Sequence, residues 1–177
     1  LMARRLIEAG VRLVGVVAWC GMAPGDKFLS IETWDMHGNG TPIFGTGWNS
    51  LGWACPRLDE ALPALIDDLS VRGLLDSTLV VANGEFGRTP KIDAGGKGRD
   101  HWPHCYTSLL AGAGVRGGAV YGASDRHAAY VKDRPVSPED FAATVLHALR
   151  IAPETRLSAD GFTRPANGGR PIVEVFG

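Results

Sequence analysis

The chain has 177 residues, of which 45% are hydrophobic and 21% charged, a composition typical of a globular domain and unlike that of a disordered or fibrous segment. The 18 basic and 19 acidic side chains leave a formal net charge of -1, which argues against a nucleic-acid partner or an anionic membrane surface. No apolar run approaches the roughly 20 residues that a membrane-spanning helix needs, so we expect no membrane span.

Glycine is unusually frequent in this chain. There are 24 glycines among 177 residues, about twice the usual share, so much of the chain is expected to form turns and shaped loops. Residues 4–10 have the pattern of a helix end that leads into a strand. We therefore expect that an amino-terminal portion precedes this segment.

The first predicted elements are a strand and a helix on either side of a long loop. Residues 11–19 form a valine-rich apolar run between Gly10 and Gly21, which predicts a strand buried on both faces, as in a parallel sheet. Residues 20–56 are irregular, and loops of this length are often functional. Residues 58–72 carry apolar side chains at helical spacing, so a helix is predicted there, with a late start or a kink at Pro63.

The second half of the chain continues the alternation of strands and helices. Residues 78–82 and 106–111 are predicted as buried strands, and a helix capped by Ser137 is predicted to run to about Arg150. The tail from Thr155 lacks periodicity, so we expect no regular element in it. This alternation predicts an α/β fold in which the three strands lie in one mostly parallel sheet, with both helices packed on it.

The first candidate site lies in the first long loop. Asp35 and His37 place a carboxylate and an imidazole two residues apart, a spacing that can hold one divalent ion in an extended turn. The alternative is that Asp35 forms an Asx turn and that His37 is a surface residue. In open α/β sheets, ligand sites lie beyond the carboxyl ends of the strands, so this loop is expected to meet the loops near residues 83–105.

The other candidate residues flank the second long loop. Glu85 follows directly on a predicted strand, and its carboxylate can bind a metal or act as a base. Arg88 can bind an oxyanion through two parallel hydrogen bonds; the alternative is an Arg88 to Glu85 salt bridge that shapes the loop. Asp100 and His101 lie just before the next strand, and this density of acids and imidazoles favours a metal site.

Several motifs, in order along nearly the whole chain, resemble those of a known bacterial family. They are WDMHGN at 34–39, NGEFGRTP at 83–90, GGKGRDHWPH at 95–104, GASD at 122–125, DRPVSPED at 133–140 and GGRPI at 168–172. Together they resemble the DUF1501 family, whose members are often labelled sulfatase-like and look similar to proteins of the alkaline phosphatase superfamily.

The resemblance implies both a fold and a function. Residues 1–177 would be a single domain, the carboxyl-terminal part of a larger, mostly parallel alkaline phosphatase-like sheet. The intact protein would be an exported (periplasmic or secreted) hydrolase of small-molecule or polysaccharide sulfate or phosphate esters. It would depend on one or two zinc-like or calcium-like ions and take its nucleophile from the amino-terminal part, and its oligomeric state stays open.

The resemblance also implies which residues form the site. By position, Asp35 and His37 resemble a first pair of metal ligands, Glu85 resembles a later aspartate, and His101 resembles a late histidine ligand. The superfamily has Asp-His where this sequence has Glu85-Phe86, so Asp100 becomes the candidate replacement ligand.

Two functions follow from these assignments. In the first, Glu85 and Arg88 are catalytic and the metal ligands are Asp35, His37, Glu85, Asp100 and His101. The alternative is a non-catalytic ligand-binding or structural protein on the same fold, in which Glu85 and Arg88 are structural.

Overall fold

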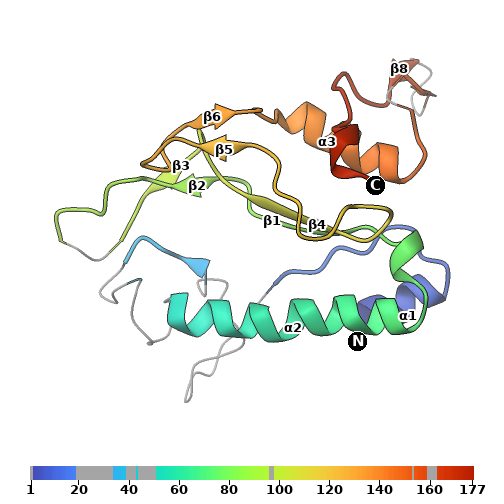
Figure 1. Ribbon diagram of the computed structural model, residues 1–177, viewed down its shortest axis with the longest axis horizontal. Coiled ribbons are helices and arrows are strands. Elements are labelled where there is room, and N and C mark those ends of the chain that lie inside the picture. Colours follow the sequence, from blue (N-terminus) through green and yellow to red (C-terminus); the bar gives the residue numbers. More distant parts are fainter. Residues whose placement is uncertain are drawn as a thin grey trace. The chain divides into compact units, whose positions relative to one another are not determined.

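The structure is a computed structural model that describes residues 2–18, 34–38, 43, 51–95, 98–152, 154–158 and 163–177 (Figure 1). The chain divides into two compact units. The first comprises Leu1–Arg72 and Glu85–Tyr106, and the second comprises Gly73–Gly84 and Thr107–Gly177. None of the described helices has the length and apolar character needed to cross a bilayer.

Two helices, α1 (Met2–Glu8) and α2 (Leu51–Val71), form one part of the first unit. The second helix confirms the prediction over residues 58–72, but it begins at Leu51 and includes both Pro56 and Pro63, so the late start is wrong. Each proline removes one backbone donor from the helix. The apolar side of α2 still buries Ala54 and Leu69, which are 0% and 2% exposed, and this burial favours a continuous helix.

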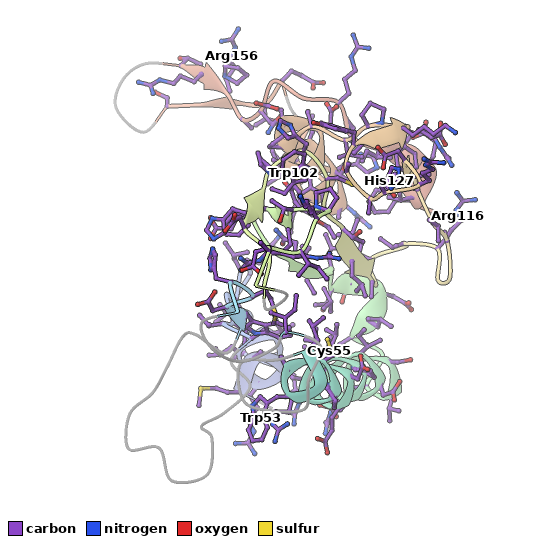
Figure 2. All side chains as sticks on the ribbon, turned by 90° about the vertical axis from the view of Figure 1, so that its left-hand side faces the viewer. Trp53, Cys55, Trp102, Arg116, His127 and Arg156 are labelled. Atoms are coloured by element: carbon purple, nitrogen blue, oxygen red, sulfur yellow. The ribbon has the colours of Figure 1, made fainter. Side chains whose placement is uncertain are left out.

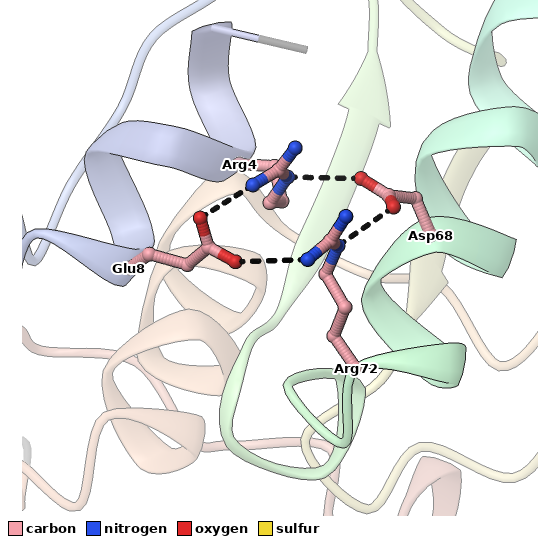
Figure 3. Close-up of polar contacts among 4 residues, drawn as sticks. All are labelled: Arg4, Glu8, Asp68 and Arg72. Carbon is pink, nitrogen blue, oxygen red and sulfur yellow. Dashed lines mark hydrogen bonds and ion pairs between the residues drawn. The ribbon is translucent and has the colours of Figure 1, made fainter.

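Four charged side chains connect α1 to α2 in a closed ring (Figure 3). Arg4 binds Glu8 on its own helix and donates from Nε to Asp68 Oδ2 on α2 at 3.0 Å. Arg72 donates from Nε to Asp68 Oδ1 at 2.8 Å and lies 3.6 Å from Glu8 Oε1. The hydrogen bond from Arg72, assisted by that from Arg4 and opposed by slight desolvation, lowers the pKa of Asp68 below its ordinary value.

This ionic ring predicts a stability that weakens in acid. Because the folded pKa of Asp68 lies below its unfolded value of about 4, the contribution of the carboxylate is complete above that pH. It is lost as the pH falls through the folded pKa. Thermal unfolding followed by circular dichroism between about pH 2 and pH 7 should therefore show a steeper acid loss in the wild type than in Asp68→Asn.

The neighbouring Asp67 provides a matched control on the same helix, because it is exposed and lies outside the ring. The Asp67→Asn variant should keep the acid dependence of the wild type. Identical acid profiles for the wild type and Asp68→Asn would show that the ring contributes nothing to stability.

The remainder of the first unit contains a short β-hairpin. Strand β2 (Gly87–Arg88) pairs antiparallel with β3 (His101–Trp102), and the register places Arg88 opposite His101. Thr89 extends the ladder by donating its backbone N–H to Asp100 O at 2.9 Å. Directly opposite residues in an antiparallel pair project from the same face, so Arg88 and His101 share one face of the hairpin.

The described part of the second unit contains short strand pairs, one α-helix and two single-turn 3-10 helices. Strand β1 (Val80–Asn83) pairs antiparallel with β4 (Ser108–Ala111), and β5 (Ala123–Ser124) pairs antiparallel with β6 (Val131–Asp133). Single-turn 3-10 helices occur at η2 (Leu75–Ser77) and η3 (Val173–Val175). The pair β7 (Arg156–Leu157) and β8 (Arg164–Pro165) shows that the tail does contain regular structure, contrary to the sequence-based expectation.

Helix α3 (Pro138–Ala148) begins as the sequence predicts. The Ser137 side chain accepts a hydrogen bond from the backbone N–H of Asp140 at 3.0 Å, and Pro138 occupies the first turn. Thr144 is 0% exposed, and its hydroxyl donates to Asp140 O at 2.7 Å and accepts from the Ile172 N–H at 2.9 Å. This buried hydroxyl attaches the carboxyl-terminal tail to α3.

The predicted mostly parallel sheet of alkaline phosphatase type is wrong. Strands β1 and β4 lie within or close to two of the expected segments, but they pair antiparallel, and the described residues form four two-stranded antiparallel sheets. Residues 11–18 belong to no strand, with Leu13 and Val17 83% and 82% exposed; Trp19 lies outside the described residues. The described residues form a small α/β arrangement of three α-helices and short antiparallel strand pairs.

The connection between β1 and β4 explains the difference. Parallel neighbours need a long crossover, which is usually a helix, whereas this connection contains the β2–β3 hairpin. The apolar runs at 78–82 and 106–111 correctly predict strands, but β1 and β4 are mostly half-buried, and Leu109 is 44% exposed. The burial on both faces that is typical of parallel strands is therefore wrong for them.

Candidate functional site

One face of the β2–β3 hairpin gathers most of the predicted site residues. Trp102, labelled in Figure 2, marks β3 in this hairpin. Residues 34–38 lie against the same hairpin, since the Arg99 N–H donates to Met36 O at 2.8 Å. All of these residues belong to the first unit.

Asp35 and His37 form a closed pair. The Asp35 carboxylate oxygen Oδ1 accepts the backbone N–H of His37 at 3.0 Å and also contacts the ring nitrogen Nδ1. Burial is the largest single influence on Asp35 and raises its pKa, but the hydrogen bonds and charge of His37 and the charge of Arg88 together outweigh it, so the pKa lies below its ordinary value. The Asx turn and the carboxylate–imidazole pair therefore coexist, and a donor at Nδ1 leaves Nε2 with its lone pair.

The guanidinium of Arg88, on β2, lies next to the lone pair of His37 Nε2. Its NH1 lies 3.4 Å from His37 Nε2 and donates to Arg99 O at 3.1 Å. Its NH2 donates to Trp34 O at 3.5 Å. The guanidinium thus connects β2 with the segment just before β3 and with residues 34–38, and these bonds fix its position beside His37.

The charges around Arg88 come mainly from aspartates. Partial burial lowers the pKa of Arg88, while the nearby charges of Asp35 and Asp100 raise it. In the described part of the chain no ion pair joins Arg88 to Glu85, which is exposed. The loop-shaping salt bridge considered from the sequence is therefore replaced by contacts from Arg88 to backbone carbonyls.

His101 completes the cluster from the opposite strand. Its ring centre lies 4.7 Å from that of His37, and it stacks on Phe86 with ring centres 3.9 Å apart. Two imidazoles that bind one tetrahedral ion at about 2.0 to 2.1 Å have ring centres about 5 Å apart. The spacing of His37 and His101 therefore suits two ligands of a single ion.

The predicted site is only partly assembled. Asp35, His37, Arg88 and His101 come together, and the charge of Asp100 also acts on Arg88. Glu85 is exposed and forms no ion pair with Arg88 in the described part of the chain. Across the described ranges, no group of three or more His, Cys, Asp or Glu residues is positioned to hold a metal ion. The two imidazoles, one of them oriented by a carboxylate, could supply two ligands of a divalent ion, and no third ligand is in place among the residues that the structure describes.

Gly98 is a site residue that the sequence analysis did not single out. A Cβ atom at this position would lie 2.0 Å from His37 O and 2.6 Å from Gly38 N. Only glycine therefore allows residues 34–38 to approach the hairpin so closely. The glycine-rich run before Asp100 was the one feature of the sequence that could have indicated a close approach here. It does not show which glycine is needed, because that depends on the contact of Gly98 with His37 and Gly38, far away in the sequence.

We predict that Gly98→Ala displaces the His37 segment. The added methyl group meets backbone atoms that cannot rotate away, so we expect about 1 to 3 kcal/mol of destabilisation, measured by denaturant unfolding. Gly95→Ala is the matched control, because its Cβ would meet the Asp93 carboxylate oxygens at 3.6 and 4.0 Å, which are ordinary contacts. Equal stability of the two variants would contradict the close approach at Gly98.

The family comparison gives a match over almost the full chain. A family model described as "Protein of unknown function (DUF1501)" matches residues 1–176. Neither the comparison with curated proteins nor the comparison with solved structures gives a match.

Proposed function

The chain belongs to the DUF1501 family, and we propose that the intact protein is a metal-dependent hydrolase of sulfate or phosphate esters, with sulfatase-like chemistry. The observation that supports this proposal is the convergence of the Asp35–His37 pair, Arg88 and His101 on one face of the hairpin. The family description assigns no activity, so the proposal rests on the chemistry of these side chains and on the resemblance of their motifs.

His37 and His101 would provide the imidazole ligands. Asp35 accepts a hydrogen bond from the Nδ1–H of His37 and thereby keeps Nε2 as the ligating atom, an arrangement that also increases the basicity of the ring. A divalent ion at such a site would lower the pKa of an attacking group and offset negative charge on the ester. Either Glu85 or Asp100, both exposed, would supply a further ligand or a base.

Arg88 would bind the ester oxyanion. Its hydrogen bonds to the carbonyl groups of Arg99 and Trp34 hold the guanidinium beside His37 before any ligand arrives. A guanidinium has five N–H groups, so donors remain for an oxyanion. A donor that is already in position stabilises developing charge without reorganisation during the reaction.

Metal analysis and an ester assay on the purified full-length protein test the proposal. We expect stoichiometric divalent metal, together with hydrolysis of an aryl sulfate or aryl phosphate that stops on chelation and returns when the metal is restored. Negligible metal and no hydrolysis after incubation with zinc or calcium would favour the alternative, a non-catalytic ligand-binding protein.

A further inference from the structure

The second unit contains a cavity that the proposed function does not use. Its volume is about 510 Å³, within the range of roughly 300 to 1,000 Å³ that is typical of small-molecule sites. Three segments line it: the loop after β4, the end of α3 with the residues that follow, and the carboxyl-terminal tail. All three segments belong to the second unit. The lining residues include Ala113, His147, Arg150, Ile151 and Phe176.

Contacts between these segments hold the walls of the cavity together. The Gly177 N–H donates to Gly114 O at 2.9 Å, and Val115 pairs with Phe176 in an isolated antiparallel bridge. The rings of His147 and Phe176 lie 5.2 Å apart between their centres, which connects the tail with α3 (Figure 1). The cavity is therefore formed by segments that are bonded or packed to one another.

Arg150 has a backbone conformation that arginine adopts only at a cost. Its φ is +59°, in the left-handed region, just after the end of α3. Its N–H donates to His147 O, and the Ile151 N–H donates to Leu146 O, both at 2.9 Å, which is the usual pattern at a helix end. Glycine is the usual residue at this position, because it has no Cβ. An arginine here indicates that its side chain has a use beyond ending the helix.

The side chains at the cavity combine apolar surface with a cation. Ile151 and Phe176 are half-buried and provide the apolar part, whereas His147 and Arg150 are exposed and provide polar nitrogen atoms. In the described part of the chain no ion pair involves Arg150, so its guanidinium is available to an anion. Mostly apolar walls with a few polar groups that fix orientation are typical of small-molecule sites.

We propose that this cavity binds a small aromatic carboxylate. The ring of the ligand packs against Phe176 and Ile151, since aromatic rings pair favourably in offset or edge-to-face arrangements. The carboxylate binds the guanidinium of Arg150, which can donate two parallel hydrogen bonds to it. The site lies in the second unit and the residues of the proposed function lie in the first, so the two proposals are independent.

Fluorescence titration of sodium naphthoate into the full-length protein tests this site. Naphthalenemethanol is the comparison ligand, because it has the same rings and no charge. The wild type should bind naphthoate about tenfold more tightly than the alcohol, as expected for a hydrogen bond to a charged group. Arg150→Gly should bind naphthoate about tenfold more weakly than the wild type and should bind the alcohol equally well. Glycine suits the left-handed backbone, so this variant should keep the melting temperature of the wild type.

Arg134→Gly is the matched control. Arg134 also has a positive φ, +43°, in the second unit, but it lies over the Tyr121 ring at 4.8 Å and is not among the residues that line the cavity. This variant should bind naphthoate as the wild type does. The absence of naphthoate binding by the wild type would overturn the proposal. Equal naphthoate affinities of the wild type and Arg150→Gly, or equal affinities of the wild type for naphthoate and the alcohol, would overturn it too.

Discussion

Replacing His37 by alanine is expected to reduce the bound metal of the full-length protein from stoichiometric to negligible. The Asp35 carboxylate holds His37 Nδ1, so Nε2 of His37 presents its lone pair as a candidate ligand. Loss of a residue that only orients a ligand typically costs 10- to 100-fold in metal affinity, so loss of the ligand itself should cost more. His101→Ala should behave in the same way, because its ring lies 4.7 Å from that of His37.

Elemental analysis after exhaustive dialysis measures this effect directly. His127→Ala is a suitable control: His127 is exposed in the second unit, where its ring nitrogen accepts from Arg126, and this variant should retain the metal. Melting curves of all three variants separate a loss of ligand from a loss of fold. Stoichiometric metal in both His37→Ala and His101→Ala would contradict the assignment, even if the parent protein hydrolyses esters.

The elements that the sequence predicts best are those fixed by neighbouring residues. The start of α3 follows from Ser137 and Pro138, because capping is satisfied within one turn. The sequence also predicts most of α2, since its apolar side repeats at helical spacing. The predicted parallel arrangement of β1 and β4 is wrong, since the two strands pair antiparallel. Strand pairing depends on the connecting segment and on partners far along the chain.

In the candidate site, too, the sequence predicts contacts between neighbouring residues better than contacts between distant ones. Asp35 and His37 are two residues apart, and the sequence alone indicates their interaction. The contact of Arg88 with His37 spans 51 positions and depends on how residues 34–38 lie on the hairpin. The sequence placed Glu85 with these residues because it follows a strand, but a position at a strand end does not determine where the side chain points.

Arg88→Ala is expected to lower the turnover of an aryl sulfate or aryl phosphate by about 10² to 10³ at saturating metal, the typical cost of losing one positioned oxyanion donor. The metal content under these conditions should be unchanged, because Arg88 supplies no ligand atom. Arg88→Lys should recover only part of the rate, since an ammonium group keeps the charge but not the planar arrangement of donors.

A purely structural Arg88 predicts a different pattern. Its bonds to the carbonyl groups of Arg99 and Trp34 would then be its whole contribution, and Arg88→Ala would lower the melting temperature. The folded fraction of that variant would turn over substrate at the wild-type rate. Steady-state kinetics at saturating metal, normalised to the folded fraction, separate the two roles, and an unchanged rate per folded molecule would remove Arg88 from the oxyanion site.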